Sequence, residues 1–114
     1  MTCRSEKSLK IMVSEKELKI IVGALDSACM EVFGAPLANY QNRSHKRKYA
    51  DVRMMSVRIL RENTCMTYVE IAELFGMHYT TIIYSYYRAG DLLLVDGAFG
   101  EKYEEYEKHF KNSL

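Results

Sequence analysis

Short polar side chains and a run of basic residues occur in the middle part of this 114-residue chain. Tyr79, Thr80 and Thr81 open an amphipathic segment, and the sequence RSHKRK occupies positions 43–48. Hydroxyl and methyl groups of this size can contact base edges in a DNA groove, and lysine and arginine neutralise phosphates. The combination favours binding of double-stranded DNA.

The distribution of charge supports the same interpretation. Residues 43–61 carry seven cations against one carboxylate, a local charge of +6, although the whole chain has a net charge of only +1. Residues 91–114 carry six acids and three lysines, a local charge of −3. A bipolar molecule of this kind steers its basic face toward a polyanion. A charge run is also the ordinary composition of a solvated helix end, and that alternative stays open.

Other chemistries find little support in the residue types. The three histidines, His45, His78 and His109, share no metal-ligand spacing with one another or with the cysteines, so neither a metal site nor another cofactor is expected. The sequence contains no G-x-x-x-x-G-K-[ST] phosphate loop and no recognisable serine–histidine–acid set. We therefore expect a binding protein and not an enzyme.

The cysteines and the hydropathy indicate a compartment. Cys3, Cys29 and Cys65 are far apart and form no C-x-x-C pair, which predicts reduced, mostly buried thiols. We find no apolar stretch of membrane-spanning length and no signal-peptide pattern. The sequence therefore predicts a cytoplasmic protein without membrane contact.

Helix start and stop signals place these residues on an all-α framework. We expect a loosely held leader over residues 1–13 and one helical domain over residues 14–112, with a bundle of five or six helices. Apolar residues recur at helical spacing along each segment. The expected helical segments are, in chain order, about 14–33, a short turn within 36–41, 44–63, 67–75, a helix that begins at 79, and 99–111.

Residues 67–88 have the pattern of a helix-turn-helix. Thr67 and Glu70 form a capping box at the start of the first helix. Gly76 follows the last apolar residue, where a left-handed C-terminal residue favours glycine. After a turn of about two residues, the second helix begins at Tyr79. Such a corner can present its second helix to the major groove.

Two motifs in this region have counterparts in a known family. TYVEIAELFG at 67–76 and MHYTTI at 77–82 are similar to S-L-P-E-I-G-x-x-F-G and R-D-H-T-T-V. Upstream, FGAPLANYQNRSHKRKYADVR aligns without gaps to that family's short linking helix and basic loop. Residues 14–112 thus resemble the C-terminal DNA-binding domain of the bacterial replication initiator DnaA, which has a Trp-repressor-like fold.

The resemblance implies roles for individual residues. Thr80 and Thr81 correspond to the pair that faces thymine methyls and the backbone in the major groove, and Arg53 corresponds to a phosphate contact. His45 aligns with the family's minor-groove arginine, a role that neighbouring bases could also take. The helix that begins at Thr67 would brace against the DNA backbone. The residues expected to contact DNA are Arg43, His45, Lys46, Arg47, Lys48, Arg53, Arg61, Thr67, Tyr68, His78, Tyr79, Thr80, Thr81 and Tyr84.

Two departures from the family bear on function. His78 and Tyr79 replace the family's Asp-His pair, which leaves recognition of the initiator's own box sequence open. The family's ATPase module has no counterpart here, so the resemblance implies a stand-alone reader of DNA that acts in replication initiation or its regulation. The alternative is an adaptor or inhibitor that binds replication proteins through exposed tyrosines, such as Tyr84 and Tyr87, and the acidic C-terminal helix. The oligomeric state and the cognate sequence stay open.

Overall fold

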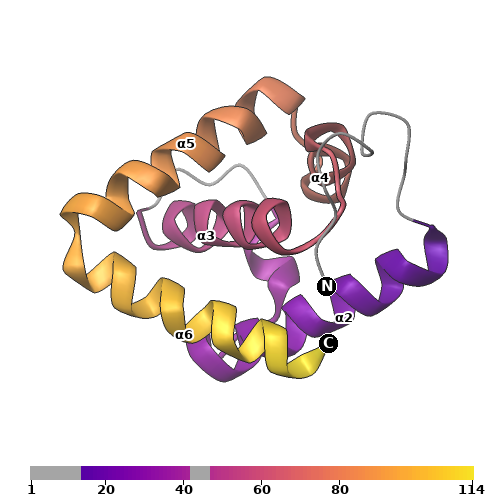
Figure 1. Ribbon diagram of the computed structural model, residues 1–114, viewed down its shortest axis with the longest axis horizontal. Helices are drawn as coiled ribbons and strands as arrows, with labels where there is room; N and C mark the ends of the chain where they lie inside the picture. Colours follow the sequence, from indigo (N-terminus) through magenta and orange to yellow (C-terminus); the bar gives the residue numbers. More distant parts are fainter. Residues whose placement is uncertain (1–13, 42–46) are drawn as a thin grey trace.

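The chain folds into a set of packed helices (Figure 1). Their apolar side chains form one core. The structure, a computed structural model, describes residues 14–41 and 47–114, and over these residues it contains no strand. The predicted all-α bundle of five or six helices is confirmed. The predicted leader at 1–13 lies outside the described residues. The elements are α2 (Glu15–Phe33), η1 (Leu37–Tyr40), α3 (Arg47–Asn63), α4 (Tyr68–Phe75), α5 (Tyr79–Val95) and α6 (Gly97–Ser113).

The first helix begins and ends at the residues that its sequence predicts. The Ser14 hydroxyl accepts from the Glu17 amide at 3.1 Å, and the Glu17 carboxylate accepts from the Ser14 amide at 3.2 Å. This reciprocal pair satisfies two amide groups at the start of α2. Gly34 ends the helix with φ 74°, a left-handed conformation that favours glycine. The carboxylate of Asp26 then accepts from the Leu37 amide at 2.8 Å and ties η1 to α2.

The second half of the chain differs from the prediction at one corner. We expected a final helix from about 99, but α5 continues to Val95 and α6 begins at Gly97. Asp96 allows this sharp corner, because its carboxylate accepts from the Phe99 amide at 3.1 Å and caps α6. Of the predicted helix at 44–63, the described part begins at Arg47.

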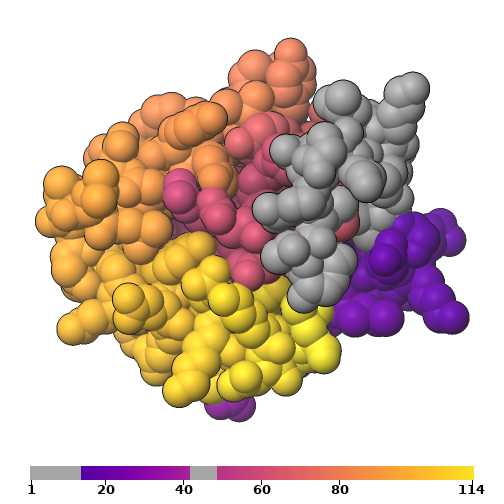
Figure 2. Space-filling model, in the orientation of Figure 1, coloured from indigo at the N-terminus to yellow at the C-terminus, as the bar shows by residue number. Residues whose placement is uncertain are grey.

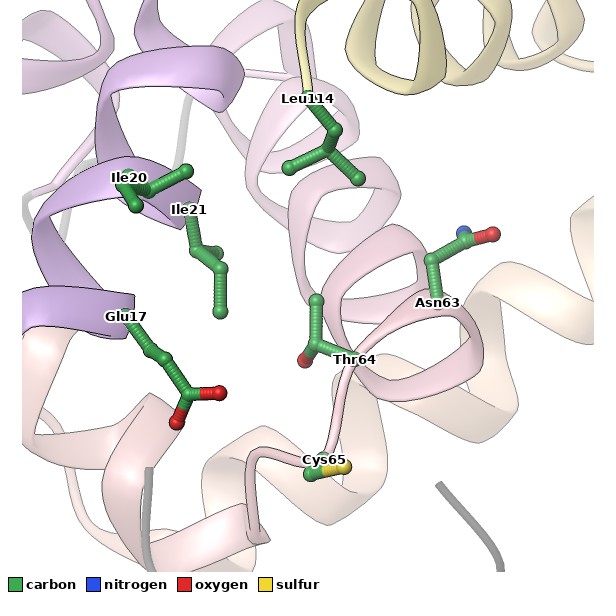
Figure 3. Close-up of a pocket in the computed structure, with 7 residues that line it drawn as sticks. All are labelled: Glu17, Ile20, Ile21, Asn63, Thr64, Cys65 and Leu114. Carbon is green, nitrogen blue, oxygen red and sulfur yellow. The ribbon is translucent and has the colours of Figure 1, made fainter. Parts of the chain in front are cut away.

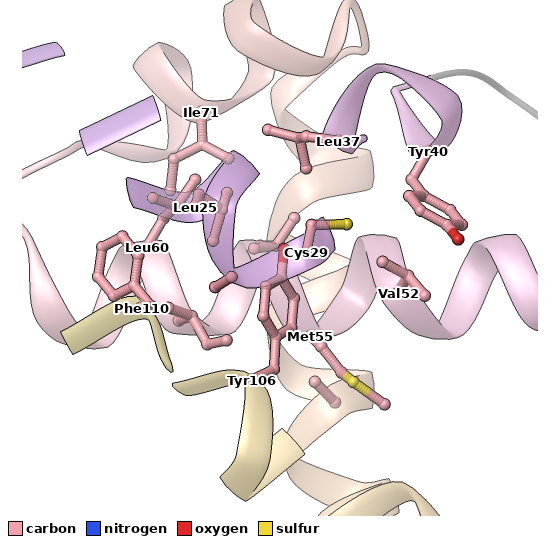
Figure 4. Packing of buried hydrophobic residues seen from close by; sticks show 14 of the residues in the cluster. Leu25, Cys29, Leu37, Tyr40, Val52, Met55, Leu60, Ile71, Tyr106 and Phe110 are labelled. Carbon is pink, nitrogen blue, oxygen red and sulfur yellow. The ribbon is translucent and has the colours of Figure 1, made fainter. Parts of the chain in front are cut away.

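The first half of the chain packs against the second half through two pairs of helices. α2 packs chiefly against α6, and α3 packs chiefly against α5. Figure 2 shows α5 and α6 as adjoining surfaces of one face, with part of α3 visible between them. Apolar side chains of α2 and α6 contact those of α3 in the core (Figure 4). Fully buried members of that core include Leu25, Cys29, Ile59, Leu60, Ile71, Ile82, Tyr106 and Phe110.

A hydrogen-bonded polar pair lies inside this core. The hydroxyls of Ser56 and Tyr106 are 2.7 Å apart, and Ser56 also donates to the Val52 carbonyl oxygen at 2.8 Å. The pair is satisfied, which is the condition under which buried polar groups are tolerated. Burial raises the pKa of the neighbouring Cys29 thiol to about 11, although a hydrogen bond with Tyr106 acts in the opposite direction.

The thiols follow the prediction only in part. Cys29 is a buried free thiol, as expected. Cys65 is disulfide-bonded, so the prediction of reduced thiols is wrong for this residue. The spacing of the cysteines in the sequence contained no signal for this bond. Disulfide bonds are unusual in a reducing compartment. Cys3 lies outside the described residues. Over the described ranges, no helix is long and apolar enough to cross a membrane.

Candidate nucleic-acid interface

The corner between α4 and α5 has the helix-turn-helix features that the sequence predicts. At the start of α4, the Thr67 hydroxyl accepts from the Glu70 amide at 3.1 Å, and the Glu70 carboxylate accepts from the Thr67 amide at 2.8 Å. At its end, Gly76 adopts φ 64°. The Gly76 amide donates to the Glu73 carbonyl at 3.2 Å, and the Met77 amide donates to the Ala72 carbonyl at 3.0 Å. This pair of bonds is the Schellman pattern, and it turns the chain directly into α5.

Packing holds α4 in place beneath the corner. Ile71, Ala72 and Phe75 are buried against the core. The side-chain amide of Gln41, which follows η1, donates to the Leu74 carbonyl oxygen at 2.8 Å. Because α4 is fixed at its cap, along its apolar face and near its end, the direction of the following helix is fixed too.

α5 has a buried face and an outer face. Ile82, Ser85, Ala89 and Leu92 recur at helical spacing and are buried. The outer face begins with Tyr79, Thr80 and Thr81, which are all exposed. Tyr84 and Tyr87 continue this face with exposed fractions of 64% and 62%. The structure therefore leaves the predicted recognition residues accessible at one end of one helix.

The first turn of α5 is ordered by His78. Its Nδ1 accepts from the Thr80 amide at 3.2 Å and lies 2.9 Å from the Thr80 hydroxyl oxygen. The His78 ring also stacks on the Tyr79 ring, with 4.7 Å between centroids and an interplanar angle of 29°. His78 was expected to contact DNA, and the structure shows its side chain as the N-terminal cap of α5.

Two of the arginines in the basic stretch are engaged inside the fold. Arg61 donates to the Met66 carbonyl oxygen at 3.1 Å, and its guanidinium lies 4.5 Å from the centroid of the Tyr68 ring. Arg58 forms an ion pair with Glu62 at 3.5 Å and covers the Tyr86 ring. The two arginines account for part of the +6 charge counted in the sequence. Less of that charge therefore faces outward than the sequence alone suggests.

The remaining predicted contacts have different surroundings. Arg53, in α3, is half-buried and interacts with other groups of the protein. Burial lowers the pKa of its guanidinium. Thr67 and Tyr68, expected to brace against DNA, are half-buried, and their side chains take part in the cap of α4 and the contact with Arg61. Arg43, His45 and Lys46 lie outside the described residues, and Arg47 and Lys48 form the first residues of α3, where their side chains are not described.

Sequence reasoning missed one cation on the outer face of α5. Arg88 is exposed and lies two helical turns after Thr80, with Tyr84 between them. Residues at i, i+4 and i+8 share one side of a helix. That spacing was visible in the sequence and would have added Arg88 to the predicted interface.

No protein-family model, curated protein or solved structure matches this chain.

A pocket also lies away from the corner between α4 and α5. A cavity of about 260 Å³ opens between α2, the loop after α3 and the C-terminal residue (Figure 3). Among the described residues that line it, Ile20, Ile21 and Leu114 have apolar side chains and Glu17 has a charged one. Over the described part of the chain, histidine, cysteine and acidic side chains form no cluster of three that could hold a metal ion.

Proposed function

We propose that the chain binds double-stranded DNA with sequence selectivity, and that α5 enters the major groove. The observation that carries this proposal is the exposed first turn of α5, where Tyr79, Thr80 and Thr81 follow directly on a capped helix corner. A helix presented in this way places short polar side chains at base edges. α4 would lie across the DNA backbone.

The charge of the chain supports the same partner. The basic residues at 43–48 immediately precede or begin α3, and α5 packs against this helix. Arg53 and the exposed Arg88 would add phosphate contacts, which position a protein on DNA without reading its sequence. Neutralisation of about six phosphates would give a log–log salt slope of about −5.

The resemblance to the DnaA C-terminal domain suggests the process. We propose a role in replication initiation or its regulation, in which this chain contributes DNA binding and no ATP-driven step. Because His78 and Tyr79 replace the family's Asp-His pair, the preferred sequence need not be the initiator's box.

The test is fluorescence anisotropy with two labelled duplexes, one randomised and one containing a DnaA box, each titrated over a range of salt concentrations. We expect binding that weakens steeply with salt. A preference for the box would extend the family's specificity to this chain, and equal affinities would call for selection of a site from a random library. Absence of binding to either duplex at low salt would overturn the proposal.

A second candidate function has an observation of its own. Leu94 and Val95, at the end of α5, are 86% and 78% exposed, and the exposed Tyr84 and Tyr87 lie on the same helix. Exposed aromatic and aliphatic side chains favour a protein interface. The second candidate is therefore an adaptor that binds replication proteins. Charge reversal of Lys46, Arg47 and Lys48 to glutamate separates the two candidate functions, because only DNA binding requires these basic side chains.

A further inference from the structure

The imidazole of His78 contacts two groups of Thr80 with a single nitrogen. Nδ1 lies 3.2 Å from the Thr80 amide nitrogen and 2.9 Å from Thr80 Oγ1. A backbone N–H can only donate, so Nδ1 must accept and carries no proton. The Thr80 hydroxyl shares that lone pair and must therefore also donate to Nδ1. Its proton points at the imidazole, and its own lone pairs are left to accept.

The surroundings hold this arrangement in place. The His78 ring is stacked on the Tyr79 ring, which restricts rotation of the imidazole. Thr80 is in the first turn of α5, whose backbone is fixed by the cap, and its side chain is exposed to whatever the helix approaches. An ordinary threonine hydroxyl rotates and can either donate or accept, so it does not distinguish between base edges. The Thr80 hydroxyl has lost that freedom.

We propose that His78 is a positioning residue for DNA recognition, which holds the Thr80 hydroxyl as an acceptor so that it selects adenine or cytosine on the contacted strand. This inference rests on the proposed function. In the major groove, adenine N6 and cytosine N4 are amino donors, whereas guanine O6 and N7 and thymine O4 are acceptors. A hydroxyl that can only accept gains a hydrogen bond from adenine or cytosine. Opposite guanine or thymine it would face another acceptor and gain none.

The experiment begins with site selection from a duplex library, followed by affinities for all four bases at each selected position. At one position we expect the wild-type protein to prefer adenine or cytosine by about tenfold. Thr80→Val, which keeps the shape and removes the hydroxyl, abolishes that preference. His78→Ala releases the hydroxyl and also removes the preference. His78→Asn restores it, because a carboxamide oxygen can accept from both the amide and the hydroxyl.

Thr81 provides the matched control for coupling. Thr81 is exposed next to Thr80, and over the described residues no hydrogen bond joins its side chain to His78. The effects of His78→Ala and Thr81→Val on base preference should therefore multiply, as for independent sites. The effects of His78→Ala and Thr80→Val on base preference should not multiply. Either change alone abolishes the preference, so the second has none left to remove. Independent effects in both pairs, or an undiminished preference in His78→Ala, would overturn the inference.

A measurement without DNA separates this inference from the proposed function. Nitrogen NMR of the free protein at a pH of about 8, where an ordinary imidazole is neutral, reports which ring nitrogen of His78 carries the proton. We expect an unprotonated Nδ1 and a protonated Nε2. A protonated Nδ1 would overturn the inference even in a protein that binds DNA. An unprotonated Nδ1 in a protein that binds no duplex would instead locate the failure in the proposed function.

Discussion

The guanidinium of Arg58 lies 4.4 Å from the centroid of the Tyr86 ring, and its Nη1 donates to the Tyr86 carbonyl oxygen at 3.2 Å. Arg58 belongs to α3 and Tyr86 to α5, so one side chain joins the central helix to the proposed recognition helix. Glu62 completes the contact, since it pairs with Arg58 and accepts a hydrogen bond from the Tyr86 hydroxyl. Gly90 provides the space, because a Cβ there would lie 2.5 Å from Arg58 Nη1.

This contact predicts an unusual response to Gly90→Ala. In an ordinary helix the change stabilises by about 1 kcal/mol. Here the added methyl group displaces Arg58 and weakens a charged hydrogen bond and a cation–π contact, so we expect a net loss of about 1 kcal/mol in the free energy of unfolding. Urea denaturation of the single variants and of the double variant with Arg58→Ala measures the effect.

The Arg58→Ala background is the control for this prediction. Without the guanidinium, Gly90→Ala should behave as an ordinary helical substitution and stabilise the protein. The same effect in both backgrounds would show that Gly90→Ala does not act through Arg58.

Two glycines predict opposite responses to the same substitution. Gly76 ends α4 with φ 64°, which strains any residue with a Cβ, so Gly76→Ala should destabilise the protein by about 1 kcal/mol. Gly23 lies within α2, and a Cβ there would meet no atom within 4 Å. Gly23→Ala should therefore stabilise by about 1 kcal/mol. Thermal or urea unfolding of both variants tests the corner geometry, and stabilisation by Gly76→Ala would contradict it.

Arg53 and Lys108 form a matched pair for the DNA proposal. Arg53→Ala should weaken binding to every duplex by a similar factor and flatten the log–log salt slope by about 1, because it removes one phosphate contact. Lys108 is an exposed cation on the acidic helix α6, and Lys108→Ala should leave both quantities unchanged. Anisotropy titrations at several salt concentrations measure the slopes. Equal slopes for the wild type and Arg53→Ala would remove Arg53 from the interface.

The features that depend on local sequence were predictable. The capping box at Thr67 and the left-handed Gly76 occur where the sequence predicts them, and the first helix has the predicted bounds. Each depends on residues within a few positions of one another, which a single sequence displays directly. The same reasoning locates the start of α5 and its outer face.

The partners of the arginines were not predictable, because they come from other helices or across loops. Arg61 was assigned to DNA, but it reaches the carbonyl of Met66 and the ring of Tyr68. Arg58 was counted in a basic patch, but it contacts α5. A long cationic side chain looks the same in sequence whether it faces a phosphate or a neighbouring ring. Only tertiary packing decides between these possibilities.

The buried thiol of Cys29 predicts a loss of stability in alkaline solution. Burial raises its pKa from 9.0 to about 11, so the folded protein keeps a proton that the unfolded chain releases. The free energy of unfolding should therefore be unaffected by this group below about pH 9 and fall as the pH rises toward about 11. At about 1.4 kcal/mol for each pKa unit, a shift of this size sets an upper limit of about 2 to 3 kcal/mol on the loss. Urea unfolding at a series of pH values measures the decline.

Comparison with Cys29→Ala isolates the contribution of the thiol to that decline. Burial also raises the pKa of Tyr106, and the tyrosine is still present in the variant. The free energy of unfolding of Cys29→Ala should therefore fall less steeply between about pH 9 and 11 than that of the wild type, without becoming constant. A decline of the same steepness in both proteins would assign the alkaline sensitivity to the tyrosines alone and contradict the raised pKa of Cys29.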